Sequence, residues 1–264
     1  MVILVTGISS GFGLETARVL AAAGHTVYGT VRRELPHEAG IHYLNVDVRN
    51  MDQVTAAVDT IIAEQGHIDV LVNNAGMGIG GPIEFAPMED VQNQMDINFL
   101  GLVRMVKAVL PHMRERKSGR IIALSSIGGL MGLPYQGYYS ASKFAIEGFC
   151  EALRLEVRPN NIKVVVVEPG DFHTGFTSKR KKEADPAALA AYPGYADSMA
   201  SIEKDETTGL TPDVLARRIL RIVESGNPSY NYIVSTFVQR LSVTLKAILP
   251  AKLFSRILGS YYKL

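Results

Sequence analysis

A tyrosine and a lysine, Tyr139 and Lys143, stand four residues apart in the segment YYSASKFAIEGF. Because residues i and i+4 lie on one face of a helix, a phenol and an ammonium at this spacing can act together. A free tyrosine has a pKa near ~10, and lowering it to about 7 requires roughly 4 kcal/mol, part of which a neighbouring cation supplies. The pair therefore indicates proton transfer to or from a carbonyl or alcohol oxygen. The alternative is two side chains on an ordinary solvated helix.

Apolar runs of strand length alternate with stretches of helical period around this pair. Val, Ile and Leu fill the apolar runs almost without a break, which is typical of parallel strands covered on both faces. The alternation predicts an α/β fold: a single Rossmann-type, doubly wound domain with a seven-stranded parallel sheet and helices on both faces. Strands are predicted at residues 2–6, 26–31, 41–46, 70–72, 120–125, 163–168 and 232–235, and helices near 14–23, 51–65, 88–117, 139–157 and 212–224.

The composition indicates one compact domain over residues 1–264. Of the 264 residues 47% are hydrophobic, enough for a large core, and the formal net charge of +1 gives no basic signature for nucleic acid. Cys150, the single cysteine, excludes an intramolecular disulfide, and we expect it to be buried and inert. The chain opens on MVILVTG without a secretory leader, and no apolar run approaches the ~20 residues of a membrane span. We therefore expect a cytoplasmic protein, and we predict no metal site.

The first predicted strand runs into a glycine-rich turn, TGISSGFG at residues 6–13, and a predicted helix follows. Glycine permits a tight turn and close approach of a ligand, and the free N–H groups and positive end of a helix attract anions. A strand, a glycine turn and a helix at the start of a βαβ unit indicate a dinucleotide site, whereas the alternative is a plain glycine-rich turn. The predicted cofactor ligands in this turn are Gly7, Ser9, Ser10, Gly11, Phe12 and Gly13.

The end of the second predicted strand indicates which nucleotide binds. A carboxylate there would bind a ribose 2′-hydroxyl, whereas an arginine suits a 2′-phosphate. This strand ends in Arg32 and Arg33, with no acidic residue before Glu34, and the Ser10 hydroxyl is a further candidate ligand. We therefore favour NADP(H) as the cofactor over NAD(H). The alternatives are NAD(H) binding and a pair of solvated arginines, because arginine is common at strand ends.

Seven motifs, in order, resemble the short-chain dehydrogenase/reductase family. They are TGISSGFG at 6–13, Asp47 after the third strand, NNAG at 73–76, Asn98 in MDINFLG, Ser126 in ALSSIGG, YSASK at 139–143 and PGDFHT at 169–174. The stretch SSIGGLMGLPYQGYYSASKFAIEG is also similar to hydroxysteroid and retinol dehydrogenases. The resemblance implies an oxidoreductase that acts on CH–OH groups with NAD(P), assembled as a homodimer or homotetramer through its two long helices.

The resemblance implies a catalytic set of four residues. Tyr139 would be the general acid/base, and Lys143 would bind the nicotinamide ribose and lower the pKa of Tyr139. Ser126 would hydrogen-bond the substrate oxygen, and Asn98 would hold a water that links Lys143 to solvent. These roles make chemical sense, because a phenol and a serine hydroxyl stabilise the oxygen that gains charge as hydride reaches a carbonyl carbon.

Two neighbours would take the catalytic places if the register were displaced by one residue. Ser125 points the opposite way from Ser126 on a strand. Tyr138 lies five residues from Lys143, off the face that Tyr139 shares with it. We expect Ser126 and Tyr139 to meet at the carboxyl edge of the parallel sheet, where ligands bind in such folds.

The resemblance also implies the remaining cofactor contacts. Asp47 and Val48 would touch the adenine. Asn74, Ala75 and Gly76 would close the sheet against the cofactor. The nicotinamide carboxamide would be oriented by Pro169, Gly170 and Thr174. Tyr139 and Lys143 complete the cofactor set.

Small and apolar residues follow two of the motifs, at 77–79 and 128–134. Small residues leave room and methionine adapts to irregular ligands, so we predict a lipophilic ketone or aldehyde and its alcohol as the substrate pair. Residues 171–210 form a long polar stretch, which is either a substrate lid or an ordinary surface excursion. The alternative for any single apolar residue is a place in the core. The predicted substrate contacts are Ser126, Gly128 and Tyr139, with pocket walls that include Tyr192, Tyr195 and Met199.

Residues 231–264 form a basic, amphipathic segment. Apolar residues recur at helical spacing on both sides of Pro250, and no acidic residue occurs. We favour packing of the apolar face on the domain or the pocket, and the alternatives are a membrane interface and a subunit contact. Two alternatives to an enzyme accordingly stay open: a cofactor-binding regulatory protein and a peripheral membrane protein without turnover. The basic residues of the segment are Arg240, Lys246, Lys252, Arg256 and Lys263.

Overall fold

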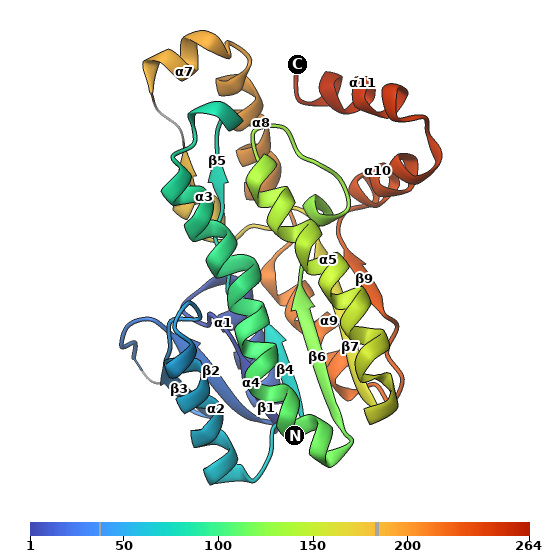
Figure 1. Ribbon diagram of the computed structural model, residues 1–264. Helices are drawn as coiled ribbons and strands as arrows, with labels where there is room; N and C mark the ends of the chain where they lie inside the picture. The colour runs from blue at the N-terminus through green and yellow to red at the C-terminus, as the bar shows by residue number, and fades with distance from the viewer. Residues whose placement is uncertain (37, 183–184) are drawn as a thin grey trace.

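A seven-stranded, all-parallel sheet forms the centre of the computed structural model, which describes residues 1–36, 38–182 and 185–264 (Figure 1). The strand order is β3-β2-β1-β4-β6-β7-β9, with the reversal beside β1 that is typical of doubly wound folds. The predicted fold class is confirmed, and every predicted strand is present within one residue at each end. The strands are β1 (Val2–Val5), β2 (Thr26–Val31), β3 (Ile41–Asn45), β4 (Val70–Asn73), β6 (Gly119–Leu124), β7 (Ile162–Pro169) and β9 (Asn231–Val234).

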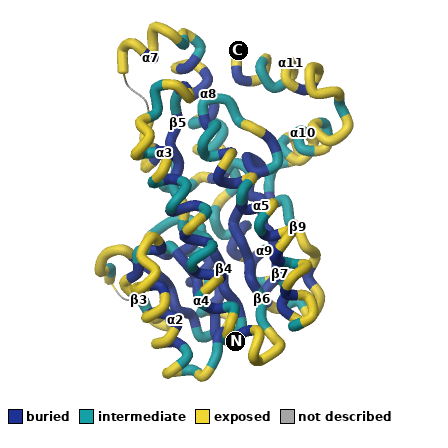
Figure 2. Tube along the Cα trace, viewed as in Figure 1, coloured by how far each residue is buried: buried dark blue, intermediate teal, exposed yellow. Residues whose placement is uncertain are grey.

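Side chains that alternate along the central strands build two cores, one on each face of the sheet. The central strands are the most buried part of the chain (Figure 2). In β1, Ile3 and Val5 face one helical layer, whereas Val2 and Leu4 face the other. Both faces are therefore covered, as the unbroken apolar strands predict. The first layer contains α1 (Gly11–Ala22) and α9 (Pro212–Glu224), and the second contains α2 (Met51–Gln65), α4 (Gly101–Arg116) and α5 (Gly137–Val157). Cys150 on α5 is buried as predicted, and burial raises the pKa of its thiol to about 12.

The single helix predicted at 88–117 is interrupted by a wider turn. Helix α3 (Met88–Met95) leads into a π-helical turn at Asp96–Leu100, and α4 follows. The N–H of Gly101 donates to the carbonyl of Asp96, five residues back instead of four. Such turns occur often at functional sites, and this one carries Asn98. The apolar period continues through the turn, which is why the sequence pattern predicts one helix.

Residues 171–182 and 185–210 fold over the carboxyl ends of the strands (Figure 1). The ends of this excursion are tied together, because the N–H of Leu210 donates to Asp171 O at 3.1 Å and the N–H of His173 donates to Leu210 O at 2.8 Å. A short parallel pair, β5 (Ile79–Gly80) with β8 (Lys181–Lys182), joins it to the segment after β4. The excursion therefore lies where a substrate lid is predicted. Its helices are α6 (Phe176–Lys179), α7 (Pro186–Ala191) and α8 (Tyr195–Thr207).

The C-terminal segment forms two helices, α10 (Phe237–Ile248) and α11 (Ala251–Tyr261), at the same end of the molecule as α8 (Figure 1). Phe254 is buried against Ile127 and Met131, which follow Ser126 in the chain. The predicted packing on the domain is thus confirmed for this side of the segment. The opposite side keeps large apolar residues in solvent. Among the described residues, no helix has the length and apolar character needed to cross a bilayer.

Candidate active site

The predicted site residues converge on the carboxyl edge of the sheet. Strand β1 ends in the glycine turn, β4 ends at Asn73, and β7 ends at Pro169. Ser126 lies two residues beyond β6, and the first two turns of α5 carry Tyr139 and Lys143. Ligands bind at this edge in open parallel sheets, so the arrangement matches a nucleotide and substrate site.

The turn after β1 accepts only glycine at three positions. Gly7 has φ +71° and Gly11 has φ +60°, in the left-handed region. A Cβ on Gly13 would lie 2.3 Å from Gly7 O. Helix α1 begins at Gly11, its N-cap Ser10 makes no side-chain cap, and its first turn has no acidic residue. The free N–H groups and the positive helix end therefore fit a pyrophosphate.

Thr6 and Asn74 hold this turn against β4. Thr6 Oγ1 accepts the N–H groups of Asn74 and Ala75, each at 2.9 Å. The Asn74 side-chain amide donates to Thr6 O at 2.8 Å and to Gly7 O at 3.1 Å. Asn74 and Ala75, two predicted cofactor residues, therefore lie directly beside the glycine turn. Thr6, which fixes their position, was not among the predicted site residues.

The Ser126 hydroxyl lies close enough to the Tyr139 phenol to act on it, and hydrogen bonding to Ser126 lowers the pKa of Tyr139. Ser126 Oγ also accepts the N–H of Gly128 at 3.0 Å and donates to Pro169 O at 3.4 Å. A Cβ on Gly128 would lie 3.4 Å from Tyr139 Cε1, so glycine leaves the side of the ring open. The two predicted proton donors therefore meet at one point, with Gly128 at its border.

The electrostatics of this point follow mainly from burial. Burial raises the pKa of Tyr139 to about 12, while the hydrogen bond with Ser126 and the Arg180 guanidinium act in the opposite direction. Lys143 Nζ lies 5.7 Å from the Tyr139 ring centroid and donates to Leu124 O at 2.8 Å. Burial lowers the pKa of Lys143 to about 8. Lys143 is not among the groups that shift the pKa of Tyr139 most, so its predicted effect on the phenol stays a prediction.

Asn98 ties the segment after β4 to α5. Its Oδ1 accepts the N–H of Met77 at 2.8 Å, and its Nδ2 donates to Met77 O at 2.9 Å and to Ser142 Oγ at 3.0 Å. Ser142 precedes Lys143, and no direct hydrogen bond joins Asn98 to Lys143, both of which the structure describes. Asn98 is thus placed beside the lysine, and its predicted water link stays a prediction.

The neighbours of the two central residues face elsewhere, as the predicted register requires. Ser125 Oγ donates to Lys143 O at 3.4 Å. The Tyr138 hydroxyl donates to Ile83 O at 3.1 Å. Neither hydroxyl takes part in the pair formed by Ser126 and Tyr139.

At the part of the site where the adenosine of the cofactor is predicted to bind, one carboxylate is in an ion pair and one arginine is not. Asp47 pairs with Arg49 at 2.5 Å, a partner that the sequence analysis did not identify, so the predicted adenine contact of Asp47 stays a prediction. Val48 is buried against α4, where a Cβ on Gly101 would lie 2.7 Å from its Cγ2. Arg32 is exposed at the end of β2, and no carboxylate of the described residues lies within ion-pair distance of it. Its charge helps to lower the pKa of Asp47, after the larger effect of Arg49.

Two lid residues that the sequence analysis did not identify reach the site. The Phe176 ring packs against the Tyr139 ring with centroids 5.7 Å apart. Lys179 Nζ donates to Ser10 Oγ in the glycine turn at 2.7 Å. Thr174, a predicted cofactor residue, accepts the N–H of Phe176 at 3.2 Å. The one sequence signal for this part of the site was the basic run KRKK at 179–182.

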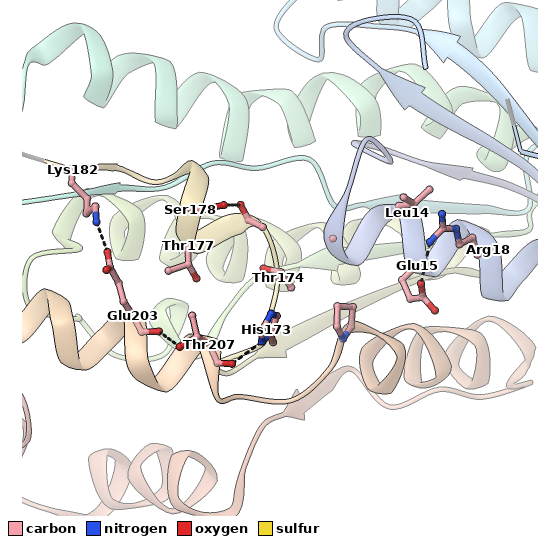
Figure 3. A pocket seen from close by; sticks show the side chains of 13 residues that line it. Leu14, Glu15, Arg18, His173, Thr174, Thr177, Ser178, Lys182, Glu203 and Thr207 are labelled. Atoms are coloured by element: carbon pink, nitrogen blue, oxygen red, sulfur yellow. Dashed lines mark hydrogen bonds and ion pairs between the residues drawn. The ribbon is translucent and has the colours of Figure 1, made fainter. Parts of the chain in front are cut away.

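An open cavity of about 680 Å³ lies beside the glycine turn (Figure 3). It is bordered by Gly11 and Thr174, two predicted cofactor residues, and none of the four catalytic residues lines it. Figure 3 shows Lys182 turned to Glu203 across one side of it. The cavity therefore adjoins the cofactor turn and not the reacting end of the site.

Comparison with known proteins agrees with this geometry. A family profile described as short chain dehydrogenase matches residues 1–185. The chain is 49% identical over 262 residues to a 3-ketodihydrosphingosine reductase of Bacteroides thetaiotaomicron, with 99% of this chain and 97% of that protein covered. It is 34% identical over 273 residues to retinol dehydrogenase 8 of Bos taurus, with 94% and 86% covered. A solved short-chain dehydrogenase of Streptomyces avermitilis superposes with a TM-score of 0.81 at 29% identity, covering 99% of this chain and 96% of that one.

Proposed function

The chain belongs to the short-chain dehydrogenase family, and from this premise we propose that it is an NADP(H)-dependent enzyme that interconverts a lipophilic ketone and its alcohol. Membership makes it an oxidoreductase that acts on CH–OH groups with NAD(P), and the proposal adds the cofactor preference and the substrate class. The observation that carries the proposal is the approach of the Ser126 hydroxyl to the Tyr139 phenol, with Lys143 beside the ring.

In the reductive direction, the ketone oxygen would lie between the hydroxyls of Tyr139 and Ser126. When NADPH is bound, its nicotinamide supplies the hydride to the carbonyl carbon. Negative charge then grows on the oxygen as the C=O π bond breaks, and Ser126 stabilises it by donating a hydrogen bond. Tyr139 gives its proton to that oxygen, which leaves a neutral alcohol and a phenolate near the Lys143 cation. In oxidation the same proton moves back.

Two cations support NADP(H) over the NAD(H)-dependent alternative. Arg32 directly follows β2, with no acidic residue before Glu34 in the sequence, and Lys179 reaches the glycine turn at Ser10. Within the described residues, neither side chain lies within ion-pair distance of a carboxylate. A 2′-phosphate would gain charge-assisted hydrogen bonds worth roughly 1.5–3 kcal/mol each, and NADH would gain none of them.

A long-chain ketone of the 3-ketodihydrosphingosine type is the substrate that we propose to test first. The name of the relative at 49% identity motivates it, since that relative matches this chain over nearly its whole length. Apolar side chains around the site support the class. Met131 and Phe254 form one cluster directly beyond Ser126, and Tyr195 and Met199 form another on the lid side. Such walls suit an alkyl tail.

The proposal is tested by following NADPH and NADH oxidation with 3-ketodihydrosphingosine and with a panel of ketones of decreasing chain length. We expect the highest kcat/KM with NADPH and the long-chain ketone. Cofactor binding without turnover on any ketone or alcohol would contradict the proposal and favour a regulatory nucleotide-binding protein.

We further propose that the outer face of α10 and α11 rests on an anionic lipid surface. Phe237, Val238 and Ile248 are 80%, 66% and 69% exposed, and residues 231–264 carry five basic and no acidic side chains. Basic amphipathic helices of this kind lie in membrane interfaces. Co-sedimentation with phosphatidylglycerol/phosphatidylcholine vesicles should show binding that the double substitution Phe237→Ser and Ile248→Ser weakens. Equal binding by both proteins would contradict the proposal.

We also propose a homodimer or homotetramer, as predicted from the family resemblance. Phe144 and Leu155 on α5 are 42% and 68% exposed, which leaves an apolar face on one of the two long helices. Sedimentation equilibrium should show the oligomer, and Leu155→Glu should shift it toward monomer. A monomer at all concentrations of the wild-type chain would contradict this proposal.

A further inference from the structure

Arg180, just after α6, is a buried cation with donor groups to spare. Its side chain is inaccessible to solvent. Its Nη2 forms an ion pair with Glu206, but Nε and Nη1 have no hydrogen-bond partner among the described residues. Buried donors are costly when they meet no acceptor, and those of a guanidinium more so. These two nitrogens are therefore suited to an acceptor that enters beside them.

The surroundings of Arg180 are those of the predicted substrate pocket. A Cβ on Gly80 would lie 3.0 Å from Arg180 Cδ, and a Cβ on Gly78 would lie 3.8 Å from its Nε. The guanidinium lies 5.6 Å from the centroid of the Phe176 ring, which in turn packs on Tyr139. Two glycines of the segment after β4 and one lid ring thus separate the arginine from the reacting end of the site.

The lid holds this arginine in a fixed position. Thr177 Oγ1 donates to Glu206 Oε2 at 2.7 Å, and Glu206 Oε1 accepts from Arg180 Nη2. The N–H of Arg180 donates to Thr177 O at 3.3 Å, and the N–H of Lys181 donates to Gly78 O at 3.3 Å. Donors fixed in this way lose little freedom when they bind a ligand.

The charge around Arg180 selects the kind of acceptor. The carboxyls of Glu206 and Asp205 lie close enough to Asp171 to raise its pKa, after the larger effect of burial, and the Arg180 cation opposes them there. A guanidinium that already faces Glu206 and Asp171 does not suit a carboxylate or phosphate ligand. A hydroxyl oxygen can accept from the free nitrogens without adding charge, and the carboxyls tolerate an amine beside it.

We propose that Arg180 Nε and Nη1 bind a hydroxyl in the head of the substrate, a few bonds from the reacting carbonyl. Arg180 then determines specificity for ketones with a hydroxylated, non-anionic head and an apolar tail. The inference rests on the proposed ketone reduction and narrows its substrate class. It places the polar head between Arg180 and the lid, and the tail along the apolar walls beyond Ser126.

The test compares two ketones in two proteins, the wild type and an Arg180 variant. Initial rates with NADPH are measured for 3-ketodihydrosphingosine and for its 1-deoxy analogue, which lacks only the head hydroxyl, in wild type and in Arg180→Met. We expect wild type to favour the hydroxylated ketone in kcat/KM by roughly a hundredfold, because buried donors reject an analogue that lacks their acceptor. In Arg180→Met the ratio should fall to within about threefold of unity, with turnover of the deoxy ketone retained.

Lys182→Met is the matched control, because it also removes a lid cation from a carboxylate, here Glu203. It should keep the wild-type ratio. Arg180→Lys keeps a cation beside Glu206 but loses the Nε donor, so it should fold, as judged by thermal unfolding, and still lose most of the preference. An unchanged ratio in folded Arg180→Met or Arg180→Lys would overturn the inference. If wild type reduced neither ketone, the proposed function would fail. The role of Arg180 would then be tested by calorimetry, as the ratio of the binding constants of the two ketones for NADPH-loaded wild type and Arg180→Lys.

Discussion

The Phe176 ring of the lid packs against the Tyr139 ring, with the two centroids 5.7 Å apart and the planes tilted by 57°. A residue from the excursion after β7 thus covers the phenol on α5 that carries the proposed proton transfer. Burial is the largest cause of the raised pKa of Tyr139, and this contact contributes to that burial. The lid therefore borders the phenol on one side, and its position affects the acidity of the phenol.

Replacing this cover should change the acidity of Tyr139. In Phe176→Ala water reaches the phenol, so its pKa should fall from about 12 toward its ordinary value, because burial disfavours the phenolate. The pH profile of alcohol oxidation, which needs the phenolate, should shift to lower pH by roughly one unit. Phe149→Ala, on a part of α5 that packs against Phe99 and not against the lid, is the control. A profile identical to wild type would show that Phe176 does not cover the phenol in the working enzyme.

The pH dependence of the two directions should differ in sign. Reduction needs protonated Tyr139 and charged Lys143, whose pKa values are about 12 and about 8. The rate of ketone reduction should therefore be flat between about pH 6 and 7 and fall above about pH 8, as Lys143 loses its proton. Oxidation needs deprotonated Tyr139 and should rise with pH over the same range. A reductive rate that rises from pH 7 to pH 9 would contradict these assignments.

The two cations near the nucleotide site should matter for NADPH alone. Arg32→Ala and Lys179→Met should each weaken NADPH binding by about 10- to 100-fold, which corresponds to roughly 1.5–3 kcal/mol for one charge-assisted contact. NADH binding should change by less than about threefold, because NADH carries no 2′-phosphate. Fluorescence titration of both cofactors checks this. An equal loss of affinity for NADPH and for NADH would show that Lys179 and Arg32 do not bind the 2′-phosphate.

The glycine turn should tolerate no side chain at Gly13. A Cβ there would lie 2.3 Å from Gly7 O and 2.5 Å from Asn74 Nδ2, so Gly13→Ala should displace the turn and cost roughly 1–3 kcal/mol of stability together with cofactor binding. Gly148→Ala is the matched control, since no atom lies within 4 Å of its Cβ position in the middle of α5. It should stabilise the fold by about 0.5–1 kcal/mol. Thermal unfolding and NADPH titration together distinguish the two variants.

The sequence predicted the residues that local motifs carry. Ser126 follows an apolar strand and Tyr139 and Lys143 share a helix face, so period and spacing were enough to place them at the sheet edge. Phe176, Lys179 and Arg180 were not predicted. Their positions depend on how a long segment without an apolar period folds back over the site. Hydrophobic periodicity in the sequence does not predict such long-range contacts. The run KRKK at 179–182 showed charge there, but not that one of its side chains is buried.

The central claim, that Tyr139 exchanges the proton with the substrate oxygen, is tested most directly by one comparison. The rate of NADPH oxidation with 3-ketodihydrosphingosine is measured for wild type, Tyr139→Phe and the adjacent control Tyr138→Phe, after NADPH titration has shown that all three bind the cofactor. We predict that Tyr139→Phe loses about 10²- to 10⁴-fold in kcat, the usual contribution of a general acid, while Tyr138→Phe stays within about threefold of wild type. Equal rates for wild type and Tyr139→Phe would contradict the account.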